Sequence, residues 1–299
     1  MNIRRENIED ETRTILESIN KIPPFPAVTN KILTLVRSED YSAKDIADVV
    51  QLDQVISSLC LKICNSAYFG LKQKVNSVQQ AVVFMGSDAI VKTVLAVTSG
   101  NVQSALECKN RGLWIHSVSC ALMSMILLNK FRTKGKLDES FKPSDEYLLY
   151  TVSLVHDIGR LVLEQFINKD FDKVEILQSH GIYNLLEIEN QLFGINHAKL
   201  GAIIANKWGF PDDLVEPIRN HHKEINMEVS TGGANLTEIL ILANSIVNLY
   251  LIYDKNVIVD IHPNLMARFD LTPNDMAEIR YALFQELSKA DEILALEDS

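Results

Sequence analysis

The feature that most constrains this chain is a histidine–aspartate pair set inside a mostly apolar run. His156 and Asp157 lie within residues 153–161, where most of the other side chains are aliphatic or small. An ionised carboxylate that is withdrawn from water needs a compensating cation or several hydrogen bonds. The adjacent imidazole makes a metal ion one candidate for that cation. The fold must therefore bring compensating groups to this pair.

The rest of the sequence indicates an all-α protein. Hydrophobic residues make up 47% of the 299 residues and charged residues 23%, with only 12 glycines and 8 prolines, which is typical of a globular chain. Apolar residues recur at helical spacing, and no segment shows a persuasive strand alternation. We expect a multi-helical bundle in which residues 1–111 form an N-terminal helical subdomain, 112–255 a second helical subdomain and 256–299 a C-terminal helical extension.

Charge and hydropathy exclude some classes of function. The net charge is −10 and the sequence pI is about 5.2. Such a chain repels a phosphate backbone unless it carries a basic patch, and we find none, so direct nucleic-acid binding is not expected. The N-terminus has no apolar signal-peptide core, and no later stretch has the charge-free length of a membrane span. We therefore expect a cytoplasmic protein without a membrane span.

Capping residues predict where several helices begin and end. Ser42 and Asp45 have the spacing of a capping box, with aspartate in place of glutamate. Gly86 is a plausible helix stop, and Asn196 is a capping residue that puts His197 in the first turn of the next helix. Each of these signals depends only on a few neighbouring residues.

Two predicted helices lie next to the subdomain boundary and around the histidine–aspartate pair. An apolar helix is expected over residues 89–97, and the more polar residues 101–111 are read as a boundary or a long connection. A second helix is expected over 147–166. We expect this helix to be interrupted at Gly159, because a residue without a side chain suits a bend or the close approach of another helix.

Further histidines in the second subdomain supply candidate metal ligands. A single such histidine would more often be a hydrogen-bonded core residue. Helices that are distant in sequence can, however, converge their inward faces on one metal site. A carboxylate beside an imidazole also suits a dinuclear site, because it can bridge two ions. The candidate metal ligands are His116, His156, Asp157, His197, His221 and His222. Imidazoles with one carboxylate fit iron, manganese, zinc or cobalt better than magnesium or calcium, and we expect iron or manganese.

The four cysteines give no comparable pattern. Cys60 and Cys64 are one helical turn apart, but no second pair follows to complete a zinc site. Together with Cys108 and Cys120 they lie mostly within apolar helical patterns, where a reduced cysteine packs as a small apolar residue. Core packing is the preferred interpretation.

At this point the sequence resembles the HD superfamily of metal-dependent phosphohydrolases, and more closely its HDOD branch, over about residues 22–247. The resemblance lies in the order of the histidines and of His156-Asp157, and in supporting motifs at residues 22–27, 64–70, 80–86, 114–117 and 208–211. It implies an all-helical, HD-domain-like fold and a bacterial signalling or regulatory role, often without a defined biochemical activity. Many members of this branch have lost some of the metal ligands, whereas this chain keeps an unusually full set.

Three departures from the catalytic relatives that cleave cyclic dinucleotides bear on activity. The Gly-Tyr-Pro motif expected after His221-His222 is absent. Arg160 stands where those relatives have lysine, which keeps the charge but alters the geometry of a phosphate contact. Asn244 occupies the position at which those relatives have their terminal aspartate ligand. An amide brings no negative charge, so Asn244 is at most a weak ligand. These departures favour binding of metal over turnover.

The sequence therefore leads to two functional hypotheses. The first is a signalling or regulatory protein that binds partner proteins through its helical scaffold and holds one or two metal ions in a degenerate HD site. A groove around residues 65–70 is a minority candidate for docking. The alternative is a metal-dependent phosphohydrolase acting on a nucleotide or cyclic dinucleotide, with Asp157 and Arg160 as catalytic residues and phosphate as the recognised group. Of these two hypotheses, we favour the first, in which the protein is not an enzyme.

Overall fold

The computed structural model describes most of the chain from residue 10 to residue 294. The residues in that span left undescribed are 11, 22–26, 39, 53–55, 58–59, 62–63, 65–74, 76, 106–110, 165–184, 224–232, 252–265 and 267. The predicted docking region at residues 65–70 therefore lies outside the described residues.

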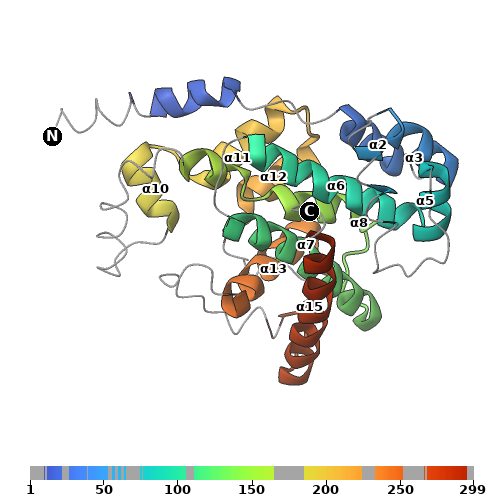
Figure 1. Ribbon diagram of the computed structural model, residues 1–299. Coiled ribbons are helices and arrows are strands. Elements are labelled where there is room, and N and C mark those ends of the chain that lie inside the picture. Colours follow the sequence, from blue (N-terminus) through green and yellow to red (C-terminus); the bar gives the residue numbers. More distant parts are fainter. Residues whose placement is uncertain are drawn as a thin grey trace.

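The described residues form helices and no strand, which confirms the predicted all-α class. One isolated parallel bridge pairs Leu137 with Ala234. The elements, drawn in Figure 1, are η1 (Ile19–Lys21), α2 (Ala27–Arg37), α3 (Ala43–Val50), α5 (Val78–Met85), α6 (Ser87–Ala105), α7 (Arg111–Lys134), α8 (Asp145–Val155), α10 (Leu185–Phe193), α11 (His197–Lys207), α12 (Asp212–Asn220), α13 (Leu236–Leu251) and α15 (Pro273–Leu294). Residues 158–164 are also helical.

The predicted caps are confirmed. The Ser42 side chain accepts a hydrogen bond from the backbone of Asp45, and the Asp45 carboxylate accepts one from the backbone of Ser42, so α3 begins with a complete capping box. Asn196 caps α11 by accepting from the backbone N–H of Lys199 at 3.0 Å. Gly86 ends α5 with a φ of 84°, a conformation that glycine adopts without strain.

The helix that carries His156 and Asp157 breaks earlier than predicted. α8 ends at Val155, His156 and Asp157 form a turn, and the helix resumes at residue 158 rather than being interrupted at Gly159. The physical reason is a side chain that competes with the backbone. The ring Nδ1 of His156 donates to the Ser153 carbonyl at 2.8 Å, which is the acceptor that the Asp157 N–H would use in a continuous helix.

Helix α6 is longer than predicted. It continues through Gly100 to Ala105 instead of ending at residue 97, so the first part of the expected connection at 101–111 is helical. The side chains of Thr98 and Thr29 are hydrogen-bonded at 2.8 Å in the protein interior, and this contact anchors the later turns of α6 to α2. The predicted division into 1–111, 112–255 and 256–299 stays a prediction.

The buried apolar side chains form two clusters. The first core is formed mainly by side chains from α2, α3, α5, α6, α8, α11 and α12, and the second core mainly by side chains from α7, α13 and α15. Figure 1 shows α10 at one end of the molecule and α2, α3 and α5 at the other, with α7, α8 and α13 between them. Helices α7, α8 and α13 each place buried side chains in both cores, so these three helices join them.

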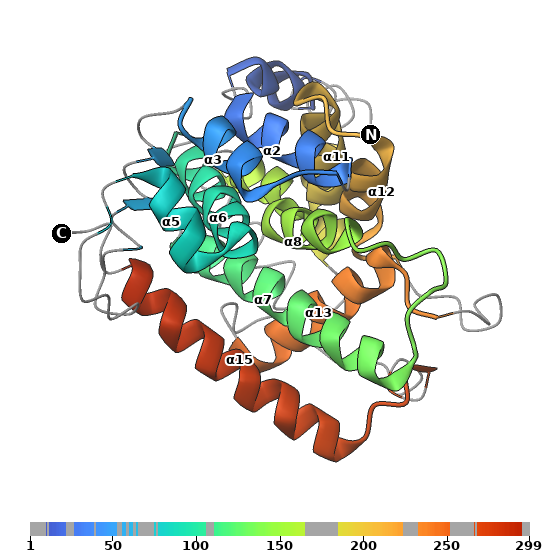
Figure 2. The same ribbon diagram turned by 90° about the vertical axis from the view of Figure 1, so that its right-hand side faces the viewer.

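The C-terminal helix α15 packs against α7 in the second core. Figure 2 shows α15 running alongside α7, and its Ile279 and Leu283 are buried in the second core. Lys130 and Lys134 of α7 form ion pairs with Asp275 at 2.6 and 2.7 Å. Hydrogen bonds from these lysines hold the pKa of Asp275 well below its usual range.

In the part of the chain that the structure describes, every helix is too short or too polar to span a lipid bilayer.

Candidate metal centre

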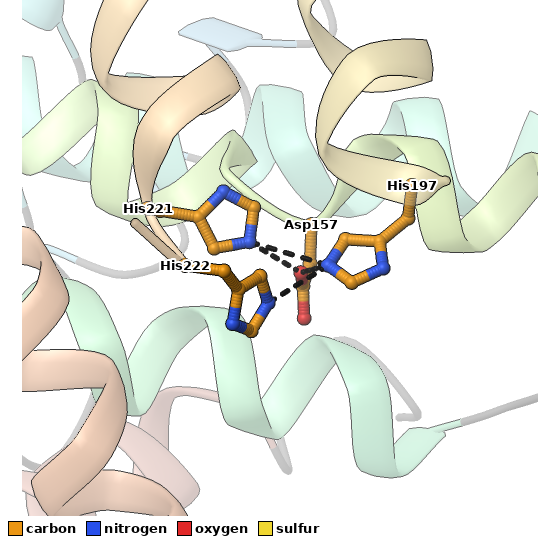
Figure 3. A group of neighbouring side chains, drawn as sticks. All are labelled: Asp157, His197, His221 and His222. Carbon is orange, nitrogen blue, oxygen red and sulfur yellow. Dashed lines mark hydrogen bonds and ion pairs between the residues drawn. The ribbon is translucent and has the colours of Figure 1, made fainter. Parts of the chain in front are cut away.

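Four separate segments bring polar side chains to one place between the two cores. His116 comes from α7, His156 and Asp157 from the turn after α8, His197 from the first residue of α11, and the pair His221-His222 from the turn that follows α12. Figure 3 shows three of the imidazoles converging on Asp157. All six predicted ligands therefore come together in the structure.

Three of the imidazoles are fixed by hydrogen bonds on the side of the ring that faces away from Asp157. Nδ1 of His156 donates to the Ser153 carbonyl at 2.8 Å, and Nδ1 of His221 donates to the Ile218 carbonyl at 2.6 Å. A carbonyl can only accept, so Nδ1 of each ring carries a proton. Nε2 is then the nitrogen of each ring that can offer a lone pair to a metal ion.

The third fixed imidazole, His197, is held by Glu189 of α10. The Glu189 carboxylate accepts from Nδ1 of His197 at 2.7 Å and from its backbone N–H at 2.8 Å. Both residues are almost fully buried. A carboxylate behind a histidine fixes the tautomer and raises the basicity of the other nitrogen, as in many metal sites.

One side-chain oxygen of Asp157 faces a first group of imidazoles, which we call the Oδ1 group and which consists of His197, His221 and His222. Asp157 Oδ1 lies 3.4 Å from Nε2 of His197 and 3.4 Å from Nε2 of His221. Nε2 of His197 lies 3.3 Å from Nε2 of His221 and 2.9 Å from Nε2 of His222. The last distance also fits a hydrogen bond between two neutral rings.

The other oxygen of Asp157 faces a second group, which we call the Oδ2 group and which consists of His116, His156 and Cys120. Asp157 Oδ2 lies 3.6 Å from Nε2 of His116 and 3.7 Å from Nε2 of His156. Cys120 lies one turn after His116 on α7, with its Sγ 3.5 Å from Nε2 of His116. Arg160 Nη1 contacts the same carboxylate oxygen at 3.5 Å.

Burial and mutual proximity set the charge of this cluster. Burial lowers the pKa of His116 to about 4 and that of His156 to about 3, so both rings are neutral near neutral pH. Burial alone would raise the pKa of Asp157. The surrounding imidazoles and Arg160 outweigh burial and hold the pKa of that carboxyl well below its usual range. The Oδ2 group therefore presents the neutral imidazoles of His116 and His156 beside an ionised carboxylate.

The cluster fits a divalent metal ion on two grounds. First, Asp157 Oδ1 and His156 Nε2 are buried and have no hydrogen-bond partner among the described residues, although such atoms are costly to leave unsatisfied. Second, two ligands at about 2.1 Å from one tetrahedral ion lie about 3.4 Å apart, and two adjacent octahedral ligands about 3.0 Å apart. The separations within the Oδ1 group match these values.

The other predicted site residues lie at the edges of the cluster. Arg160 Nη1 is in contact with Asp157, and its catalytic role stays a prediction. The side-chain oxygen of Asn244 accepts from Nδ2 of Asn248 at 3.0 Å and lies 4.0 Å from Cys120 Sγ, so Asn244 is next to the Oδ2 group. Its role as a weak ligand stays a prediction.

Sequence reasoning missed two members of the site. Glu189 reads as an ordinary acidic residue of an amphipathic helix, and only its position between the apolar residues Ile188 and Phe193 hints at burial. Cys120 reads as a core residue of an apolar helix. Its i, i+4 spacing from His116 is the available signal, because residues four apart share a helix face.

The Glu189→Gln variant should bind a divalent ion about 10- to 100-fold more weakly than the wild type. Glutamine carries no charge, and its amide nitrogen would replace one of the two carboxylate oxygens that face Nδ1 of His197 at 2.7 and 2.9 Å, so it raises the basicity of the ring less. Calorimetric titration of the metal-free protein measures the change. The matched control is Glu187→Gln, an exposed glutamate two residues earlier on the same helix, which should bind like the wild type. Equal affinities for the two variants would contradict this role of Glu189.

Comparison with known proteins identifies the family and the fold. The family model described as the HDOD domain matches residues 22–224. A solved structure from Marinobacter aquaeolei VT8, described as a candidate signal transduction protein, is 18% identical with a TM-score of 0.69 and covers 98% of this chain and 64% of its own. One from Shewanella amazonensis SB2B, described as a candidate phosphohydrolase, is 20% identical with a TM-score of 0.61 and covers 94% and 97%. At these identities both show the fold alone.

Among curated proteins, an uncharacterised protein of Treponema pallidum (strain Nichols) is 22% identical over 222 residues, which is 72% of this chain and 42% of the relative. The chain thus spans less than half the length of this relative. The family assignment rests on the domain match, which extends over most of the chain and includes all six predicted metal ligands, from His116 to His222. By that match, the chain belongs to the HDOD domain family.

Proposed function

We propose that this chain is a cytoplasmic signalling or regulatory protein of the HDOD type that binds partner proteins and holds one or two metal ions in the cluster around Asp157. The observation that carries the metal part is the pair of buried, unsatisfied atoms, Asp157 Oδ1 and His156 Nε2. Both atoms offer a lone pair, and a metal ion in each ligand group would satisfy them.

A dinuclear site is favoured by the way the two ligand groups divide around one carboxylate. Asp157 Oδ1 faces His197, His221 and His222, whereas Asp157 Oδ2 faces His116 and His156. A bridging carboxylate has this arrangement, because each oxygen serves a different ion. With several imidazoles and one carboxylate, iron or manganese is our proposal for the metal. Bound there, the metal would supply Lewis acidity, and the protein's own residues hold the ligand nitrogens in place.

Metal analysis of protein purified without added metal tests the proposal. We expect at least one iron or manganese ion per chain, either as purified or after anaerobic loading with iron or manganese, measured by mass spectrometry of the digested protein. Content that stays below about one tenth of an ion per chain after loading would overturn the metal part. The partner part is tested separately by affinity capture, and loss of captured protein on changing residues 65–70 is the expected result.

The second candidate is a metal-dependent phosphohydrolase. The contact between Arg160 Nη1 and Asp157 at 3.5 Å favours it, since Arg160 is about one-quarter exposed and so reaches from the cluster towards solvent. A guanidinium so placed can bind and orient a phosphate group. The similarity in fold to the Shewanella protein is consistent with this candidate. Neutral imidazoles beside the carboxylate could hold a proton acceptor in place but do not by themselves establish turnover.

Turnover of a panel of nucleotides and cyclic dinucleotides by metal-loaded protein decides between the two candidates. The regulatory proposal expects wild type and Asp157→Ala to give the same background rate. A wild-type rate that exceeds the Asp157→Ala rate by about 100-fold or more would support the enzyme instead.

A further inference from the structure

We propose that Cys120 is a thiolate ligand of the metal ion bound by the Oδ2 group, so that the two halves of the centre differ in chemistry. The inference rests on the proposed metal-binding function and names a ligand that the histidine–aspartate pattern does not include. The Oδ1 group offers three imidazoles and a carboxylate oxygen, whereas the Oδ2 group offers two imidazoles, a carboxylate oxygen and a sulfur atom.

The geometry supports a shared ion. Donor atoms of His116, Cys120 and His156 all lie within 4.8 Å of one another, and all three side chains are buried. Sγ of Cys120 is 3.5 Å from Nε2 of His116. A sulfur at about 2.3 Å and a nitrogen at about 2.1 Å from one tetrahedral ion lie about 3.6 Å apart, so this separation is that of two ligands of the same ion.

A second, independent observation points to a ligand in this group. Nε2 of His156 is fully buried and lacks a hydrogen-bond partner among the described residues, while Nδ1 of the same ring is already committed to the Ser153 carbonyl. The Nε2 lone pair is therefore held towards His116 and Asp157, and the ring centroid lies 5.4 Å from that of His116. An ion between His116, His156 and Cys120 satisfies it.

Simple core packing is a weaker explanation for Cys120 than for the other described cysteines. Cys60 and Cys64 lie in the first core among aliphatic side chains. Cys120 borders the second core but turns its sulfur towards polar atoms, and its contact with the Asn244 oxygen is 4.0 Å, which is long even for a thiol. The thiol thus has no strong hydrogen bond and lies beside a carboxylate and an imidazole.

A thiolate ligand would change which ion the Oδ2 group prefers. Sulfur is a soft donor that favours zinc, cobalt, iron or copper over manganese. The Oδ1 group has only nitrogen and oxygen donors and accepts manganese more readily. We therefore expect the two halves to differ in metal preference, with the thiolate half the more selective against manganese.

Reconstitution of the full chain with cobalt(II), under reducing and anaerobic conditions, tests the inference. We expect a near-ultraviolet thiolate-to-cobalt charge-transfer band in the wild type, its loss in Cys120→Ser, and its retention in the control variant Cys60→Ser. Cobalt bound per chain is measured on the same samples. Cys120→Ser should also weaken binding of one ion by roughly tenfold or more.

X-ray absorption of the cobalt-loaded wild type removes the dependence on variant folding, and a sulfur neighbour at about 2.3 Å is expected. Bound cobalt with no sulfur neighbour and no charge-transfer band would overturn the thiolate ligand while leaving the proposed function intact. A band that survives in Cys120→Ser and disappears in Cys60→Ser would also overturn it. Failure of the wild type to bind cobalt, iron or manganese at all would instead overturn the proposed metal-binding function itself.

Discussion

The Gly159→Ala substitution should lower the free energy of unfolding by about 3 kcal/mol or more, or prevent folding. A methyl group at Gly159 would overlap the backbone carbonyl oxygen of His197 and would lie 2.8 Å from the backbone nitrogen of Gly201. Both atoms belong to the main chain of α11, so the clash cannot be relieved by turning a side chain. Helix α11 would have to move away, and His197 would leave the cluster with it.

The control for this variant is Gly201→Ala, on the other side of the same contact. There the added methyl would meet side-chain carbons, Ile218 Cγ2 at 3.1 Å and Ile158 Cγ2 at 3.4 Å, which can adjust. Alanine is also favoured over glycine within a helix by about 1 kcal/mol, so the net change should be within about 1 kcal/mol of zero. Urea unfolding monitored by circular dichroism measures both variants. Equal losses of stability would contradict the backbone clash.

The Asp157→Asn variant should lose metal binding in both halves of the centre. An amide can direct only one oxygen at one ion and brings no charge, whereas the carboxylate oxygens each face a separate ligand group. At a metal concentration of about 1,000 times the dissociation constant, the wild type should gain about 4 kcal/mol of stability from bound metal and the variant almost none. Thermal unfolding with and without metal, together with metal analysis, measures the difference.

Asp145→Asn is the matched control, since Asp145 lies in the first turn of α8, the helix that leads to Asp157, and accepts from the backbone N–H of Lys142. It should bind metal like the wild type. Wild-type metal content in Asp157→Asn would exclude Asp157 as a bridging ligand.

Local signals predicted the helices well. The capping box at Ser42, the stop at Gly86 and the cap at Asn196 are all present because each depends on hydrogen bonds within a few residues. The close approach of a helix at Gly159 was also predicted, and the contact with α11 confirms it. The break at His156 was not predicted, because it depends on whether the His156 ring or the Asp157 backbone N–H donates to the Ser153 carbonyl.

The site was predictable only in part. The histidines and Asp157 were recognised because their order resembles a known pattern and because a charge in an apolar run needs an explanation. No sequence pattern singles out Glu189 or Cys120, since acidic residues are common in amphipathic helices and cysteines are common in apolar ones. Their placement beside His197 and His116 depends on how α10 packs against α11 and how α7 packs against α8, which no local pattern specifies.

The Nδ1 hydrogen bonds of His156, His197 and His221 have a further consequence for binding. They fix three rings in their final orientation before any ion arrives, so little conformational entropy remains to be lost when it does. The cluster is therefore preorganised, with several lone pairs held close together. A cation bound here would satisfy these lone pairs with little reorientation of the three rings, which favours tight binding.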